Sequence, residues 1–149
     1  MTRQSATEGR DHMLYMKAKD YGIIVKHARD GLPNEACGLL AGTVYGDIKQ
    51  VEKVYRLTNM DASREHFSMD PKEQLEAVKD MRANGLQLLG NFHSHPETPS
   101  RPSEEDKRLV FDIRLSYLIL SLMDEGNPVL KAFLYNEKKE VTEEKIEII

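Results

Sequence analysis

The stretch GNFHSHPETPSRPSEED, residues 90–106, follows an apolar run and combines two histidines, three prolines and four acids. If the strand expected over residues 86–92 continues to His95, the two-residue period of a strand places His93 and His95 on one face, about 7 Å apart along the backbone. Asp106 lies beyond a proline-rich loop and can return to the same place. Two imidazoles and one carboxylate, with a fourth position open to water, form the ligand set of a catalytic zinc site.

The same residues also have an interpretation without a metal. The run from Ser103 to Asp106 has the pattern of a capping box that opens a helix, and a His-x-His pair occurs by chance in surface loops. The two interpretations are compatible if Ser103 starts the helix while the Asp106 side chain points back at the histidines. Spacing alone leaves both open.

Length and charge narrow the class of protein. The chain of 149 residues fits one domain, for which we expect residues 13–149 preceded by a polar tail, residues 1–12. Its 21 Lys and Arg against 25 Asp and Glu give a net charge of -4, spread along the chain. This balance argues against a nucleic-acid binder, which relies on phosphate contacts, and against a polybasic membrane patch.

The chain has no feature that indicates export or a membrane span. Its single cysteine, Cys37, excludes an internal disulfide framework and fits a reducing compartment. The first residues contain no apolar signal core. The longest uncharged apolar stretch, LSYLILSLM at 115–123, is far shorter than the roughly 20 residues that span a bilayer. We therefore expect a cytoplasmic protein that does not bind membranes.

Hydrophobic periodicity predicts an α/β fold with helices and strands. Apolar residues at helical spacing predict one helix over 17–30 and a second over 71–84, the latter capped by Asp70. Their expected inward faces are Tyr21, Ile24, Val25 and Ala28 in the first helix, and Leu75, Val78 and Met81 in the second. The other expected elements are strands over 36–43, 48–57, a short stretch around Phe67, 86–92, 116–123 and 129–135, a third helix over 104–114 and an edge strand over 140–149.

The functional positions resemble the signature of the JAMM, or MPN-plus, zinc metalloproteases. The match consists of the run His93-Ser94-His95-Pro96, then Ser103 and Asp106 at the family spacing, and an upstream glutamate, Glu35, in PNEACGLLAG. The segment NMDASREHFSMDPKEQ, residues 59–74, is similar to small prokaryotic members of the family. The resemblance runs from about residue 17 to the C-terminus.

The resemblance implies a role for each matched residue. His93, His95 and Asp106 would bind one zinc ion, whose fourth ligand is water. Glu35 would be the general acid and base, and Ser103 would donate a hydrogen bond to the developing oxyanion. The implied architecture is a three-layer α/β/α fold with a mixed central sheet, similar to cytidine deaminases.

The resemblance also implies a substrate. Small bacterial JAMM proteins act on sulfur carriers that resemble ubiquitin, and archaeal relatives remove such proteins from conjugates. We therefore expect hydrolysis of the bond after a C-terminal Gly-Gly, with the carrier as partner; oligomeric state, including a homo-oligomer, stays open. One alternative is a non-catalytic MPN-type binding module. Another is the JAMM-like domain of DNA-repair-associated proteins, which the acidic charge disfavours.

The remaining cysteine, histidines and Glu97 are not expected to take part in the zinc chemistry, with His66 and Glu97 as the two open cases. Cys37 lies in an apolar run with no neighbouring base, so we expect a small strand residue and not a nucleophile. His12 and His27 are expected to bind no metal. His66 is a weaker candidate for the substrate channel, and Glu97 could compete for zinc although the family does not use that position.

Overall fold

The computed structural model describes residues 12–149; residues 1–11, most of the expected tail, lie outside the described residues. The boundary between tail and domain therefore stays a prediction. The helices and strands of the described part are, in chain order, β1 (Met13–Met16), α2 (Ala18–Gly31), β2 (Cys37–Tyr45), β3 (Ile48–Leu57), α3 (Pro71–Ala83), β4 (Gln87–His95), α4 (Glu104–Arg108), β5 (Ser116–Ser121), β6 (Val129–Tyr135) and β7 (Val141–Ile148).

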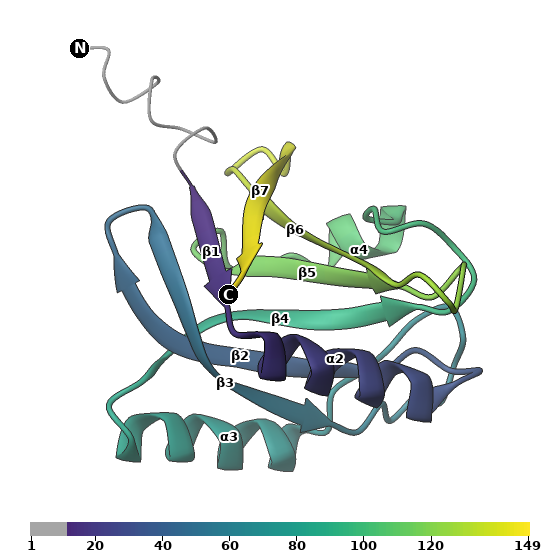
Figure 1. Cartoon of the computed structure of the whole chain (residues 1–149), viewed down its shortest axis with the longest axis horizontal. Coiled ribbons are helices and arrows are strands. Elements are labelled where there is room, and N and C mark those ends of the chain that lie inside the picture. Colours follow the sequence, from purple (N-terminus) through teal and green to yellow (C-terminus); the bar gives the residue numbers. More distant parts are fainter. Residues whose placement is uncertain (1–11) are drawn as a thin grey trace.

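The strands form one mixed sheet that closes on itself in the order β1-β3-β2-β4-β5-β6-β7 (Figure 1). β4 pairs with β5 in parallel, β1 pairs in parallel with both β3 and β7, and the other pairs are antiparallel. The expectation of an edge strand over 140–149 is wrong. β7 has a neighbour on both sides, because β1, which the sequence pattern did not indicate, places Met13 opposite Lys145.

Helices α2 and α3 cover opposite faces of the sheet, which confirms the three-layer α/β/α arrangement (Figure 1). In β2, Leu40 belongs to the core beneath α2, while its neighbour Leu39 belongs to the core beneath α3, since successive side chains of a strand alternate. The inward face expected for α2 is confirmed: Ile24, Val25 and Ala28 are buried, and Tyr21 packs against them.

The face expected for α3 is partly wrong. Met81 is buried as expected, but Leu75 is 56% exposed and Val78 only half-buried, whereas Ala77 is buried. Ala77 and Met81 are one helical turn apart on the same face, and Leu75 lies two residues, about 200°, from Ala77 around the helix. The sequence pattern gave weight to the larger side chains, while the small Ala77 lets the helix approach the sheet.

Two other expected elements are shorter than the sequence pattern indicates. The helix expected over 104–114 ends at Arg108, and the chain then turns where the Asp112 carboxylate accepts from the backbone N–H of Arg114 at 2.9 Å. The strand expected around Phe67 is reduced to a single bridge between Asn59 and Met69.

Ile149, the residue after β7, holds the start of α2. The residue before the helix, Lys17, provides no side-chain cap. Instead the backbone N–H of Ala18 donates to the carbonyl of Ile149 at 2.8 Å, and the N–H of Ile149 donates to Met16 at 2.8 Å. These bonds satisfy part of the unpaired backbone at the helix N-terminus and orient α2 across the ring of strands.

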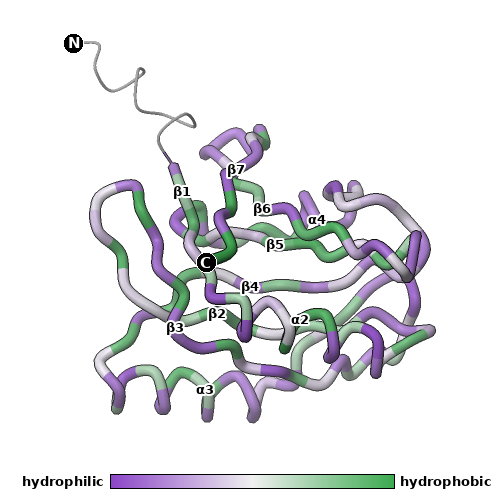
Figure 2. Tube along the Cα trace, viewed as in Figure 1, coloured by the Kyte–Doolittle hydropathy of each residue, from purple (hydrophilic) through white to green (hydrophobic). Residues whose placement is uncertain are grey.

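Figure 2 shows a largely hydrophobic β5 and an α3 whose residues alternate between hydrophobic and hydrophilic. This fits their positions, because all of β5 is buried whereas α3 exposes one side. Among residues 12–149, no helix has the length and apolar character needed to cross a bilayer.

Candidate metal centre

β4 carries both histidines of the candidate site, His93 and His95, at its C-terminal end. The strand extends to His95, as the sequence analysis supposes, and lies between β2 and β5, where Cys37 faces His93 and Ser121 faces His95. Both imidazoles are buried. The two-residue period therefore puts the two rings on one face, with centroids 5.0 Å apart.

Asp106 reaches the histidines from α4. Ser103 is the N-cap of this short helix, and its hydroxyl accepts from the backbone N–H of Asp106 at 3.0 Å. In return, Oδ2 of Asp106 accepts from the backbone N–H of Ser103 at 2.9 Å. The capping box and the return of Asp106 to the histidines thus occur together, so the two interpretations of this segment are compatible.

The three side chains form a compact triangle. Nε2 of His93 lies 3.2 Å from Nε2 of His95 and 3.3 Å from Oδ2 of Asp106, and Nε2 of His95 lies 3.2 Å from the same oxygen. Ligands at about 2.0–2.1 Å from a tetrahedral zinc ion are separated by about 3.3 Å. Within the described residues, this is the one group of three histidine, cysteine or acidic side chains that could hold a metal.

Outer contacts prepare His95 to bind a cation. Nδ1 of His95 lies 2.9 Å from the carbonyl oxygen of Pro99. A carbonyl can only accept, so Nδ1 carries a proton, which leaves Nε2 as the atom of His95 that could bind a cation. His93 is held differently, because its ring stacks on Phe67 with centroids 4.6 Å apart, and its Nδ1 has no hydrogen-bond partner among the described residues.

The charge states of the triangle suit a cation. Burial lowers the pKa of His93, which keeps the imidazole neutral. Burial alone would raise the pKa of Asp106, but the hydrogen bonds with His93 and His95 outweigh it and hold that pKa well below its usual range. Burial also acts to lower the pKa of His95, but the Asp106 carboxylate and the Pro99 carbonyl outweigh it and raise that pKa. The site therefore offers one neutral imidazole, one carboxylate and a second imidazole that must lose a proton to bind a cation.

Glu35 lies just before β2, close enough to interact electrostatically with His95 and Asp106 of the triangle. Its carboxyl group is buried, and burial raises its pKa to about 8, against the opposing effect of His95. The next residue is fixed to β4 twice: the N–H of Ala36 donates to the Ser94 hydroxyl at 2.8 Å, and the N–H of Ser94 donates to the carbonyl of Ala36 at 2.9 Å. Glu35 can therefore exchange a proton near neutral pH.

Ser94 and Phe67 are contributors that sequence reasoning missed. The alternation of β4 was a usable signal for Ser94, because a residue between two inward histidines must point to the other face. No local signal indicates that Phe67 stacks on His93. The hydroxyl of Ser103, an exposed residue, accepts from Asp106 and still has its own proton to donate.

The weaker candidates lie outside the triangle. His66 pairs with Asp61 at 3.2 Å, and Glu97 pairs with Arg64 at 3.3 Å. Cys37 is fully buried, and burial raises its pKa to about 12, which is incompatible with a thiolate nucleophile.

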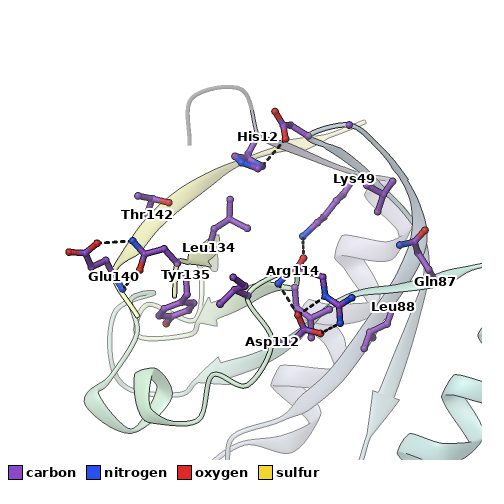
Figure 3. Close-up of a pocket in the computed structure, with 16 residues that line it drawn as sticks. His12, Lys49, Gln87, Leu88, Asp112, Arg114, Leu134, Tyr135, Glu140 and Thr142 are labelled. Atoms are coloured by element: carbon purple, nitrogen blue, oxygen red, sulfur yellow. Dashed lines mark hydrogen bonds and ion pairs between the residues drawn. The ribbon is translucent and has the colours of Figure 1, made fainter. Parts of the chain in front are cut away.

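A separate pocket lies at the other end of the ring. This cavity of about 880 Å³ is lined by residues from the start of β4, including Gln87, and from the β2–β3 turn (Figure 3). Beneath it Nζ of Lys49 donates to the Ser116 hydroxyl at 2.6 Å, and that hydroxyl donates to Glu144 at 2.6 Å. Arg114 on its wall is paired with Asp112 at 2.9 Å. The pocket is thus separate from the triangle, and these charges are already neutralised.

The fold and the triangle together are those of a JAB/MPN-type domain. A family model of prokaryotic homologs of the JAB domain matches residues 17–135, and the chain belongs to this family. The family recognised from the motif is thereby confirmed.

Three similar proteins place the chain within the family. It is 29% identical to the CysO-cysteine peptidase of Mycobacterium tuberculosis over 142 residues, 95% of each protein. It is 33% identical to the desampylase of Pyrococcus furiosus over 112 residues, covering 75% of this chain and 74% of that protein. A solution structure of a protein from Desulfitobacterium hafniense is 58% identical, with a TM-score of 0.85, and covers 92% of this chain and 93% of that chain.

Proposed function

We propose that this protein is a zinc-dependent metallopeptidase or isopeptidase that hydrolyses the bond after the C-terminal Gly-Gly of a ubiquitin-like sulfur-carrier protein. The observation that carries the proposal is the triangle of His93, His95 and Asp106 beside the buried Glu35. The names of the relatives, a CysO-cysteine peptidase and a desampylase, support a hydrolase with a protein carrier as substrate.

His93, His95 and Asp106 would bind the zinc ion through two nitrogens and one oxygen. Bound zinc would supply a Lewis acid and a water molecule whose pKa is lowered to about 7. The protein contributes the preformed triangle, since the Pro99 carbonyl sets the tautomer of His95 and the Ser103 N–H orients the carboxylate.

Glu35 and Ser103 would carry out the rest of the chemistry. The Glu35 carboxylate would accept a proton from the attacking water and then donate it to the nitrogen of the leaving amine. The Ser103 hydroxyl donates to the scissile carbonyl oxygen as negative charge develops there, and one such donor is worth about 3 kcal/mol. No covalent intermediate is required, in agreement with the inert Cys37.

The test is intact-mass analysis of a Gly-Gly-tailed carrier after incubation with the zinc-loaded protein. Three substrates distinguish the possible reactions: a carrier with a short peptide extension, one with a single added amino acid, and one joined to a lysine side chain. We expect a product that ends at the second glycine, absent with Glu35→Gln, which should retain zinc, and present with the matched control Glu147→Gln, a change at an exposed position of β7. Equal cleavage by Glu35→Gln would contradict the mechanism. A zinc-loaded protein that binds the carrier without cleaving it would favour the binding-module alternative.

A further inference from the structure

Within the described part of the chain, no hydrogen bond positions the Glu35 carboxyl group. Within residues 12–149, its buried Oε1 atom has no hydrogen-bond partner. A carboxyl group that transfers protons must still lie at a defined distance from the reacting atoms, because small displacements cost large factors in rate. The main chain at Glu35 must therefore set the direction in which the side chain points.

Two hydrogen bonds hold that main chain on the side opposite β4. The backbone N–H of Glu35 donates to the carbonyl of Ser63 at 2.7 Å. The carbonyl of Glu35 accepts from Nδ2 of Asn59 at 3.0 Å. Both partners belong to the loop of residues 59–69, so the position of Glu35 depends on the order of this loop.

Asn59 organises the same loop with the rest of its amide group. Nδ2 also donates to the carbonyl of His66 at 3.1 Å, and Oδ1 accepts from the backbone N–H groups of Asp61 and Ser68, each at 3.0 Å. These bonds use both donors and both acceptor sites of the amide. These bonds also fix the orientation of the amide group. If the amide were flipped, its NH2 group would face the N–H groups of Asp61 and Ser68, and its oxygen would face the carbonyls of Glu35 and His66.

The loop that Asn59 closes reaches the active site at two points. It presents the Ser63 carbonyl to Glu35, and it places the Phe67 ring on the His93 imidazole at 4.6 Å. One amide group therefore connects the proposed proton carrier with the packing of a proposed zinc ligand. The backbone N–H of Met60 also donates to the carbonyl of Ser68 at 2.8 Å within the loop, while side-chain contacts such as the Arg64–Glu97 ion pair are exposed and weak.

We propose that Asn59 is a positioning residue, which sets the direction of the Glu35 carboxylate through the Glu35 carbonyl and through the loop of residues 59–69. This inference rests on the function proposed above for Glu35. It predicts that loss of the Asn59 donors slows the chemical step and leaves zinc binding intact.

Two substitutions separate the donors of Asn59 from its acceptors. Asn59→Asp keeps the two acceptor bonds that shape the loop and loses the bonds to Glu35 and His66, whereas Asn59→Ala loses all four. Asn84→Asp is the matched control, because Nδ2 of Asn84 donates to the carbonyl of Asp80 at 2.8 Å at the end of α3. Kinetics on the cleaved carrier should show kcat lower by about tenfold or more for both Asn59 variants, with KM within about twofold of wild type and zinc content unchanged. The control should match wild type.

Amide hydrogen exchange gives a readout that does not depend on activity. In both Asn59 variants the Glu35 amide should exchange faster than in wild type, while the amides of α2 keep their wild-type exchange rates. In the control Asn84→Asp, the Glu35 amide should exchange at the wild-type rate. If Asn59→Ala does not fold, Asn59→Asp still provides both measurements. A kcat for Asn59→Asp within about twofold of wild type, or a loss of kcat that equals a loss of zinc, would overturn the inference. If the wild-type protein cleaves no carrier, the proposed function fails, and unchanged exchange at Glu35 would separately overturn the role of Asn59.

Discussion

Zinc should stabilise the folded protein, and the change His95→Gln should remove most of that stabilisation. His95 is the informative position because its Nε2 atom lies 3.2 Å from both other ligand atoms. Glutamine removes this nitrogen ligand without adding a charge. His66→Gln is the matched control, since His66 is exposed, pairs with Asp61 and lies outside the triangle.

The expected size follows from where the ligands come from. His93 and His95 end β4 while Asp106 lies in α4, so the unfolded chain has no preformed site and zinc binds mainly to the folded state. Free zinc at a hundredfold excess over its Kd then adds about 2.7 kcal/mol to the free energy of unfolding. For a chain of this length each kcal/mol raises Tm by about 2–4 °C, so the total rise is about 8 °C. The variant His95→Gln keeps only two ligands, so we expect zinc to raise its Tm by less than about 2 °C under the same conditions.

Scanning calorimetry of chelator-treated protein, with and without buffered free zinc, measures this difference. Wild type and His66→Gln should show the full rise in Tm, and His95→Gln should show little of it. The same rise in His95→Gln and wild type would place the ion elsewhere. A wild-type Tm that does not respond to zinc would refute the assignment of the triangle as a zinc site.

Three further predictions concern stability. In zinc-free protein, burial raises the pKa of Glu35 from 4.5 to about 8, so the folded state keeps a proton that the unfolded state releases, and stability falls as pH rises between these values. Urea unfolding should show that the free energy of unfolding of Glu35→Gln increases relative to that of wild type from pH 5 to pH 8. Parallel curves of this free energy against pH would contradict the prediction. Met81→Ala should lower the free energy of unfolding by about 2–5 kcal/mol and Leu75→Ala by less than about 0.5 kcal/mol, and equal losses in denaturant melts would mean that the buried face of α3 is misassigned. Glu144→Leu should cost about 3–5 kcal/mol because Lys49, which is linked to Glu144 through the Ser116 hydroxyl, then loses that buried negative charge. Adding Lys49→Met should restore most of the loss, and additive losses in the same assay would argue against coupling.

Much of the triangle was predictable from sequence because it depends on local rules. The period of a strand puts His93 and His95 on one face, and a capping box orients Asp106 at the start of α4. Both rules involve residues a few positions apart, where the chain itself limits the geometry. The one further requirement was that Asp106 of α4 lies next to the histidines of β4, and the family resemblance implied this.

The features that sequence reasoning missed depend on contacts between distant segments. Ile149 caps α2, a role that no pattern near residue 18 indicates. Asn59 reaches Glu35 across 24 positions, and its neighbours in sequence show only that the loop is polar. In α3, Ala77 is buried and Leu75 exposed because the surface that the helix contacts decides its inner face, not side-chain size.

The closure of the sheet by β1 has a consequence for the order of folding. The four-residue strand β1 covers β3 and β7, and its pairing of Met13 with Lys145 joins segments that lie 132 positions apart in the sequence. Until β7 leaves the ribosome, β1 and β6 present unpaired backbone, the kind of edge that recruits strands from other chains. Because such distant pairings are slow to form, the nascent protein stays exposed to aggregation until β7 has paired with β1.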